Sequence, residues 1–245
     1  MAYGTAVEIV ETRFVKFDKP TVIEGFPSVG LVGSIATEYI ATKLEMEEIG
    51  FIKSTRLPPV TIVKDGVPKA PIRIYSKDNI IVFVSDTAVP ESLTYDLART
   101  IVDWCKKHGA VKIISVGGIA REEKPSEAKI YVVGTDPVEI AKIIETKKYS
   151  AIKLGFLTGL LGILMMESGE AGIPAHAYLT DALLDAPDPK AAAKTVDAIV
   201  DELGLKLETQ SLVQTSDKIE KKISQLMHQT KHHLEESKAY PSVYG

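Results

Sequence analysis

Cysteine is nearly absent from this sequence, because Cys105 is the single cysteine among 245 residues. One thiol cannot build a disulfide framework or a thiolate metal cluster, so both ways of stabilising a small fold are excluded. A hydrophobic segment of transmembrane length is also lacking, since the most apolar run, residues 154–166, has only 13 residues. The first fifteen residues lack the apolar core of a signal peptide. We therefore expect a cytoplasmic protein with no membrane partner.

Charge of one sign is not in large excess. The formal net charge is −4, and no run of basic residues is longer than two. Nucleic acids and anionic membranes select basic patches, so neither is expected as a partner. The hydrophobic content of 45% and charged content of 25% are typical of a chain that buries a full core.

Short apolar segments alternate with amphipathic segments along residues 1–204. Several of the apolar segments are continuous, which indicates strands buried on both faces of a largely parallel sheet. We predict an α/β body, residues 1–204, with three layers: a mostly parallel sheet covered by helices on both faces. A hairpin between residues 60–63 and 71–75, around Lys64-Asp65-Gly66, is expected to add an antiparallel piece. The expected strands are 21–25, 49–54, 79–85, 110–116, 129–133, 151–154 and 174–179, and the expected helices are 29–44, 91–108, 137–145, 157–167 and 190–203.

A glycine-rich turn follows the first predicted strand. Gly25, Gly30 and Gly33 surround a strand-to-helix turn, where a helix N-terminus can bind phosphate. The spacing matches neither the dinucleotide fingerprint nor a P-loop, because Leu31-Val32 stand where a P-loop needs lysine and a hydroxyl residue. Close packing of helix on sheet explains the glycines equally. An α/β enzyme that binds a nucleotide or phosphorylated small molecule at Gly25–Gly33 is therefore kept as the alternative function.

No constellation of residues requires catalysis. His176 and Asp181 could belong to a triad, but no G-x-S-x-G nucleophile motif occurs in the sequence. Asp86 follows a strand, at a position that also suits an ordinary loop. His228 and His232 are four residues apart on a predicted helix, without a third metal ligand nearby. We therefore predict no catalytic residues, no metal site and no cofactor.

Polarity rises after Gly204, and residues 209–237 read as one long helix within a C-terminal segment, residues 205–237. Leu212, Ile219, Ile223 and Leu226 recur at steps of four and three, which places them on one seam. This seam predicts a helix that mediates oligomer contacts or acts as an arm.

The last segment, residues 238–245, contains Pro241 and ends in Val243-Tyr244-Gly245. A tyrosine behind a hydrophobic residue and before a free carboxylate offers buried area, a hydroxyl group and a charge to a partner. A frayed tail with a chance tyrosine is the other interpretation.

Three stretches carry a resemblance to a known family. They are GFPSVGLVG, TGLLGILMMESGEAGIPAHAYL and DAPDPKAAAKTVDAI, within about residues 7–204. Together they resemble the archaeal branch of the proteasome assembly chaperone family. The ending Val243-Tyr244-Gly245 is similar to the hydrophobic-Tyr-X signature of proteasome activators.

The resemblance implies a non-catalytic α/β body that binds proteasome α subunits as a homo-oligomer. Val243 would fill an apolar site, Tyr244 would insert between adjacent α subunits, and the Gly245 carboxylate would pair with a lysine. Whether a related second protein takes part, and whether the tail is free or held within the oligomer, stays open at this point.

Overall fold

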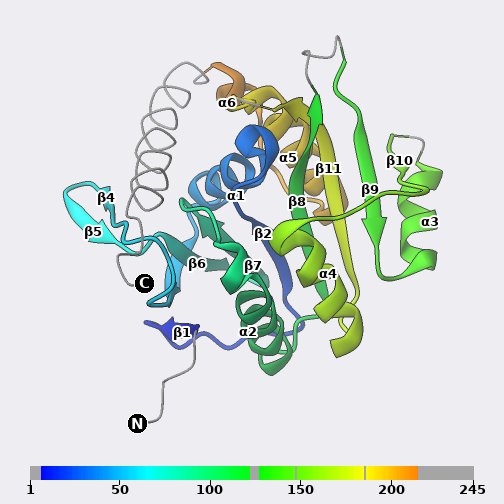
Figure 1. The fold of residues 1–245 in the computed structure, drawn as a ribbon. Coiled ribbons are helices and arrows are strands. Elements are labelled where there is room, and N and C mark those ends of the chain that lie inside the picture. Colours follow the sequence, from blue (N-terminus) through cyan, green and yellow to red (C-terminus); the bar gives the residue numbers. More distant parts are fainter. Residues whose placement is uncertain (1–6, 122–126, 147, 185, 215–245) are drawn as a thin grey trace, which may run out of the picture.

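The computed structural model describes residues 7–121, 127–146, 148–184 and 186–214. Its centre is a nine-stranded sheet with the order β1-β3-β6-β7-β2-β8-β11-β9-β10 (Figure 1). The strands are β1 (Glu8–Glu11), β2 (Thr21–Gly25), β3 (Glu47–Lys53), β6 (Ile72–Lys77), β7 (Ile80–Ser85), β8 (Lys112–Arg121), β9 (Ile130–Gly134), β10 (Ser150–Ala151) and β11 (Ala175–Leu183).

The middle of the sheet is parallel, and its flanks contain the antiparallel pairs. β7, β2, β8 and β11 are neighbours that all run in the same direction. The neighbouring pairs β1–β3, β3–β6 and β6–β7 are antiparallel, and so is the pair β9–β11. The continuous apolar runs that indicated parallel strands are these central strands, as expected for strands buried on both faces.

Helices cover both faces of the sheet, which confirms the predicted α/β architecture (Figure 1). On one face α1 (Val32–Lys43) packs against α5 (Pro189–Leu203), and on the other α2 (Thr94–Lys107) packs against α4 (Gly159–Ala171). Two hydrophobic clusters lie beneath these layers, one on each face. The remaining helices of the described residues are α3 (Pro137–Glu145), α6 (Gln210–Gln214), and the 3-10 turns η1 (Val29–Leu31) and η2 (Glu91–Leu93).

The local sequence explains where several helices begin and end. Asp136 accepts hydrogen bonds from two amides in the first turn of α3, and Asp188 accepts one from the Ala191 amide in the first turn of α5. A proline follows each aspartate at the first helical position. Gly204 ends α5 in the left-handed conformation, with φ of 63°. These caps are the Asp-Pro and glycine signals that are visible in the sequence.

The predicted hairpin was wrong in its partner strand. β4 (Ile62–Lys64) pairs with β5 (Val67–Lys69) in a separate two-stranded sheet, with Asp65-Gly66 at the turn. Residues 72–77 instead form β6, which pairs with β3 and β7 in the main sheet. The turn signal was read correctly, but the apolar residues of β6 belong to the core of the main sheet.

Candidate functional site

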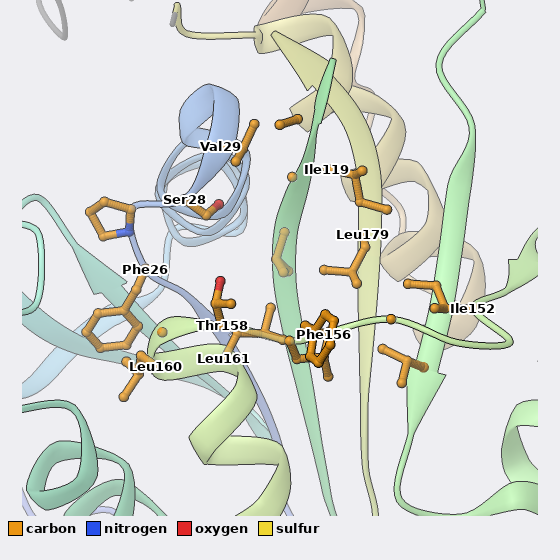
Figure 2. Close-up of a pocket in the computed structure, with 18 of the residues that line it drawn as sticks. Phe26, Ser28, Val29, Ile119, Ile152, Phe156, Thr158, Leu160, Leu161 and Leu179 are labelled. Atoms are coloured by element: carbon orange, nitrogen blue, oxygen red, sulfur yellow. The ribbon is translucent and has the colours of Figure 1, made fainter. Parts of the chain in front are cut away.

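A cavity of about 820 Å³ lies beyond the carboxyl ends of β2 and β8. It is lined by the turn after β2, by the second half of β8, and by the loop of residues 152–158 with the start of α4 (Figure 2). Single residues of β9 and β11 complete the lining. In an α/β sheet, the carboxyl ends of the parallel strands are where ligands commonly bind. Residues 26–29 of the turn that the sequence singled out thus line one side of the cavity, whereas its three glycines do not.

The glycines of this turn are explained by close packing. A Cβ on Gly33 would lie 2.5 Å from the Phe26 carbonyl oxygen and 2.8 Å from that of Val116. A Cβ on Gly25 would lie 2.3 Å from the Gly33 carbonyl oxygen. Helix α1 therefore lies directly against the ends of β2 and β8, and the space beside Gly25 and Gly33 is occupied by the protein's own backbone.

Most of the residues that line the cavity are apolar. They include Phe26, Val29, Val116, Ile119, Val133, Ile152, Leu157, Leu160, Leu161 and Leu179, most of which Figure 2 draws around the open space. The loop before α4 carries two large side chains that face solvent, Leu154 at 95% and Phe156 at 98% exposure. Apolar side chains so fully exposed are unusual and mark a surface suited to contact.

One carboxyl group belongs to this largely apolar cavity. Glu24, on β2, is only 1% exposed, and its Oε1 atom has no hydrogen-bond partner among the described residues. Burial raises the pKa of Glu24 to about 7, although the Ser115 hydroxyl and the Phe26 amide lower it in part. Ser115 lies opposite Glu24 in the β2–β8 register. Glu24 is thus close to half ionised at neutral pH.

Two hydroxyl groups at the starts of helical segments also face the cavity. Ser28 precedes η1 and Thr158 precedes α4, yet neither side chain caps its helix. The Ser28 Oγ atom is buried without a hydrogen-bond partner in the described part of the chain. Figure 2 shows both hydroxyl groups directed into the space between η1 and the start of α4.

The structure separates the residues that were weighed as a catalytic triad. His176 and Asp181 lie on β11, five residues apart, and therefore on opposite faces of the sheet. His176 bonds Glu202, whereas Asp181 pairs with Arg121 and accepts from the Lys129 amide. Neither contact prepares a nucleophile.

Asp86 has a structural partner as well. One of its oxygens lies 2.7 Å from the guanidinium group of Arg73, whose side chain is 2% exposed. Arg73 also pairs with Glu38 and donates to the Tyr75 hydroxyl group. Asp86 therefore neutralises a buried cation at the end of β7.

Of the four seam residues, only Leu212 lies in the described part of the chain. Its side chain is 1% exposed and belongs to the core cluster beneath α1 and α5. Ile219, Ile223 and Leu226 lie outside the described residues, as do Val243, Tyr244 and Gly245 and the pair His228 and His232.

Comparison with known proteins gives the family. The model of the PAC2 family matches residues 22–227, which is most of the chain. The chain belongs to the PAC2 family. PbaA of Pyrococcus furiosus, an archaeal homolog of proteasome-assembly chaperone, is 32% identical and superposes with a TM-score of 0.85, over 93% of this chain and 99% of that one.

Two further relatives extend this result. An uncharacterized protein of Methanocaldococcus jannaschii is 27% identical, over 96% of this chain and 98% of the relative. Pyrococcus furiosus PbaB, an archaeal proteasome activator, is 22% identical with a TM-score of 0.78, over 91% of this chain and 99% of that one, and shares the fold. The PAC2 fold therefore spans nearly the whole chain.

A second polar cluster in this PAC2 chain lies at the opposite end of the central strands. Glu202 Oε2 is 2.9 Å from His176 Nε2 and accepts from the Tyr178 hydroxyl group at 2.9 Å. The Lys112 ammonium group pairs with both Glu202 and Glu139. Ligand atoms of Glu139, His176 and Glu202 lie within 4.8 Å of one another, but Lys112 supplies the positive charge that a metal ion would bring.

The sequence did not reveal this cluster, because its members come from β8, α3, β11 and α5. Burial alone would raise the pKa of Glu202, but His176 and Lys112 outweigh it and hold that pKa at about 2. Glu202 is consequently ionised at all moderate pH values, and the cluster fastens α5 to the sheet. Across the described residues, no helix has the length and apolar character needed to cross a membrane.

Proposed function

We propose that this protein is a proteasome assembly chaperone, or a proteasome-associated factor, that binds proteasome α subunits through Val243-Tyr244-Gly245. The observation that carries the proposal is the match to PbaA along nearly the full length of both chains. The ending of the sequence supports it independently, because it has the hydrophobic-Tyr-X pattern.

The described residues that follow Gly204 are attached to the body by several contacts. The Tyr39 hydroxyl group donates to the Glu208 carbonyl oxygen at 2.6 Å and lies 2.6 Å from Ser211 Oγ. Leu212 is buried just beyond these contacts. Attachment of these residues to the body lowers the conformational entropy that the chain beyond them would lose on binding a partner, which supports the proposal.

A homo-oligomer fits this proposal, because one short tail binds weakly and several tails joined together gain avidity. The seam residues Ile219, Ile223 and Leu226 are proposed to contribute to the oligomer or the arm. A related second protein could join the assembly without changing the role of the tail. Catalysis plays no part in this proposed function. The space beside Gly25 and Gly33, where the sequence suggested a phosphate site, is occupied by the protein's own backbone.

The test compares tail variants for binding to purified α subunits. Tyr244→Ala and deletion of residues 243–245 are expected to weaken binding by tenfold or more, since each removes the aromatic anchor, and loss of such anchors costs roughly 2 kcal/mol or more. Ser242→Ala is the matched control and should bind as the parent does. Tyr244→Phe separates the ring from the hydroxyl group. Unchanged affinity after deletion would contradict the role of the tail, and absence of α-subunit binding by the full chain would contradict the function.

A further inference from the structure

The cavity beside β2 contains polar atoms that the fold leaves without partners. The Glu24 Oε1 and Ser28 Oγ atoms are buried, and neither has a hydrogen-bond partner among the described residues. Buried polar atoms in folded proteins are almost always satisfied, and leaving one unpaired is costly. Most of the residues that line the cavity around Glu24 are apolar and offer a carboxyl group no hydrogen bond.

The size and lining of the cavity suit a small organic molecule. A volume of about 820 Å³ lies within the range of small-molecule sites, which combine apolar walls with a few polar groups. An anionic ligand such as a phosphate would face Glu24. Lys153, exposed on the loop of residues 152–158, is the single basic side chain among the described lining residues.

We infer that the cavity binds a small organic amine, whose apolar body contacts the walls and whose ammonium group pairs with Glu24. An ammonium group has three N–H donors, and Glu24, Ser28 and Thr158 are lining residues whose carboxylate and hydroxyl oxygens can accept them. Figure 2 shows the hydroxyl groups of Ser28 and Thr158 at the cavity. The exposed Leu154 and Phe156 at the open side add apolar surface for the body of the ligand. This site does not depend on the proposed binding of α subunits.

The inference predicts how binding responds to pH. The amine stays protonated between pH 6 and pH 8, whereas Glu24, with a pKa of about 7, changes from mostly neutral to mostly ionised. The groups that face Glu24 are the Ser115 hydroxyl group from β8 and the Phe26 amide, and Phe83 is its neighbour on β7. Lys153 and Glu24 are the charged side chains among the described lining residues. Amine affinity should therefore rise roughly tenfold from pH 6 to pH 8.

The experiment uses the full chain and three amines: hexylamine, cyclohexylamine and phenethylamine. Hexanol and hexanoate serve as neutral and anionic probes of similar apolar body. We expect at least one amine to bind in calorimetry and to raise the melting temperature, because a ligand that binds the folded state stabilises it. Hexanol should bind more weakly, and hexanoate should not bind.

Glu24→Gln keeps the shape of the side chain and removes its charge. It should weaken amine binding by roughly tenfold or more, as expected when one partner of a buried ion pair is removed. Glu145→Gln, an exposed position on α3, is the matched control and should leave binding unchanged. Because the pH profile of the parent protein tests the same pairing without a mutation, the inference remains testable if Glu24→Gln fails to fold. Failure of all three amines to bind, equal binding of hexylamine and hexanoate, or a flat pH profile would overturn it.

Discussion

Burial of the Glu24 carboxylate lowers the free energy of unfolding by an amount that depends on pH. Its pKa is about 7 in the folded chain against an ordinary value of 4.5, so the folded state holds this proton more tightly than the unfolded state does. Below pH 4.5 both states are protonated and the cost vanishes. As pH rises through 4.5 to 7 the unfolded state gains from ionisation, and above pH 7 the full cost is present.

Glu24→Gln should therefore stabilise the protein at pH 8, by up to about 3 kcal/mol, and much less at pH 5. The measurement is urea unfolding of both proteins at the two pH values. A gain at pH 8 would mark Glu24 as a residue kept at the expense of stability, as is common at binding sites. Equal stability at pH 8 would show that the carboxyl group is already satisfied in the folded chain.

Glu202 has the opposite linkage. Its folded pKa of about 2 lies below the ordinary 4.5, so its contribution to stability is present above pH 4.5 and is lost as pH falls towards 2. We expect the ionised Glu202 carboxylate to account for about 3 kcal/mol of the free energy of unfolding that is lost on acidification. Glu202→Gln should flatten that part of the stability profile between pH 5 and pH 2. It should also lower stability at pH 7, since His176 and Lys112 lose a buried partner. A profile of unchanged slope would refute the assignment.

At the scale of elements, the close contact of α1 with the turn after β2 and with β8 requires glycine at position 33. Gly33→Ala places a Cβ against two backbone carbonyl groups, which cannot rotate away, and should cost roughly 1–3 kcal/mol. Gly169 on α4 is the matched control, because its Cβ would meet Thr135 at an ordinary 3.5 Å. Gly169→Ala should stabilise its helix by about 0.5–1 kcal/mol. Thermal unfolding of the two variants measures these opposite signs, and a neutral Gly33→Ala would contradict the packing explanation.

The sequence predicted those elements whose signals are local. The continuous apolar runs of β7 and β8 and the Asp-Pro caps of α3 and α5 stand out without knowledge of the partners. β1 was missed because it is a short edge strand with a half-exposed pattern. The hairpin partner was misassigned because register depends on which strands are neighbours in the sheet, and this is not encoded within either strand.

The candidate site could be predicted only in part, for the same reason. The glycine turn marked one wall of the cavity from the sequence alone. Glu24 lies in the predicted strand 21–25, but the sequence did not show that a cavity forms beside it, because β8 and the loop before α4, which also line the cavity, are far away in the chain. The partners His176 and Glu202 are likewise joined only by the packing of α5 on β11.

At the scale of the whole molecule, residues just after Gly204 contribute to the packing of the body. The sequence placed this boundary at residue 204, where polarity changes. Leu207 and Leu212 nevertheless pack on the core cluster beneath α1 and α5, and Tyr39 holds the Glu208 carbonyl group and Ser211. The packed body thus continues through the start of α6.

Two shortened chains test this boundary. A chain ending at Gln214 keeps every contact just described, whereas a chain ending at Gly204 loses the burial of Leu207 and Leu212 and leaves the Tyr39 hydroxyl group without these partners. Loss of one fully buried leucine alone costs about 2–3 kcal/mol. Urea unfolding should therefore show the shorter chain to be at least about 3 kcal/mol less stable than the longer one, with a lower midpoint.

The same pair separates stability from partner binding. Both shortened chains lack Val243, Tyr244 and Gly245, so neither should bind α subunits with the affinity of the full chain, although the chain ending at Gln214 remains folded. Light scattering of that chain also tests the seam, since loss of the oligomer is expected if Ile219, Ile223 and Leu226 hold it together. An oligomer of unchanged size would instead assign assembly to the body. Equal stability of the two shortened chains would show that residues 205–214 do not stabilise the body and that the body ends at residue 204.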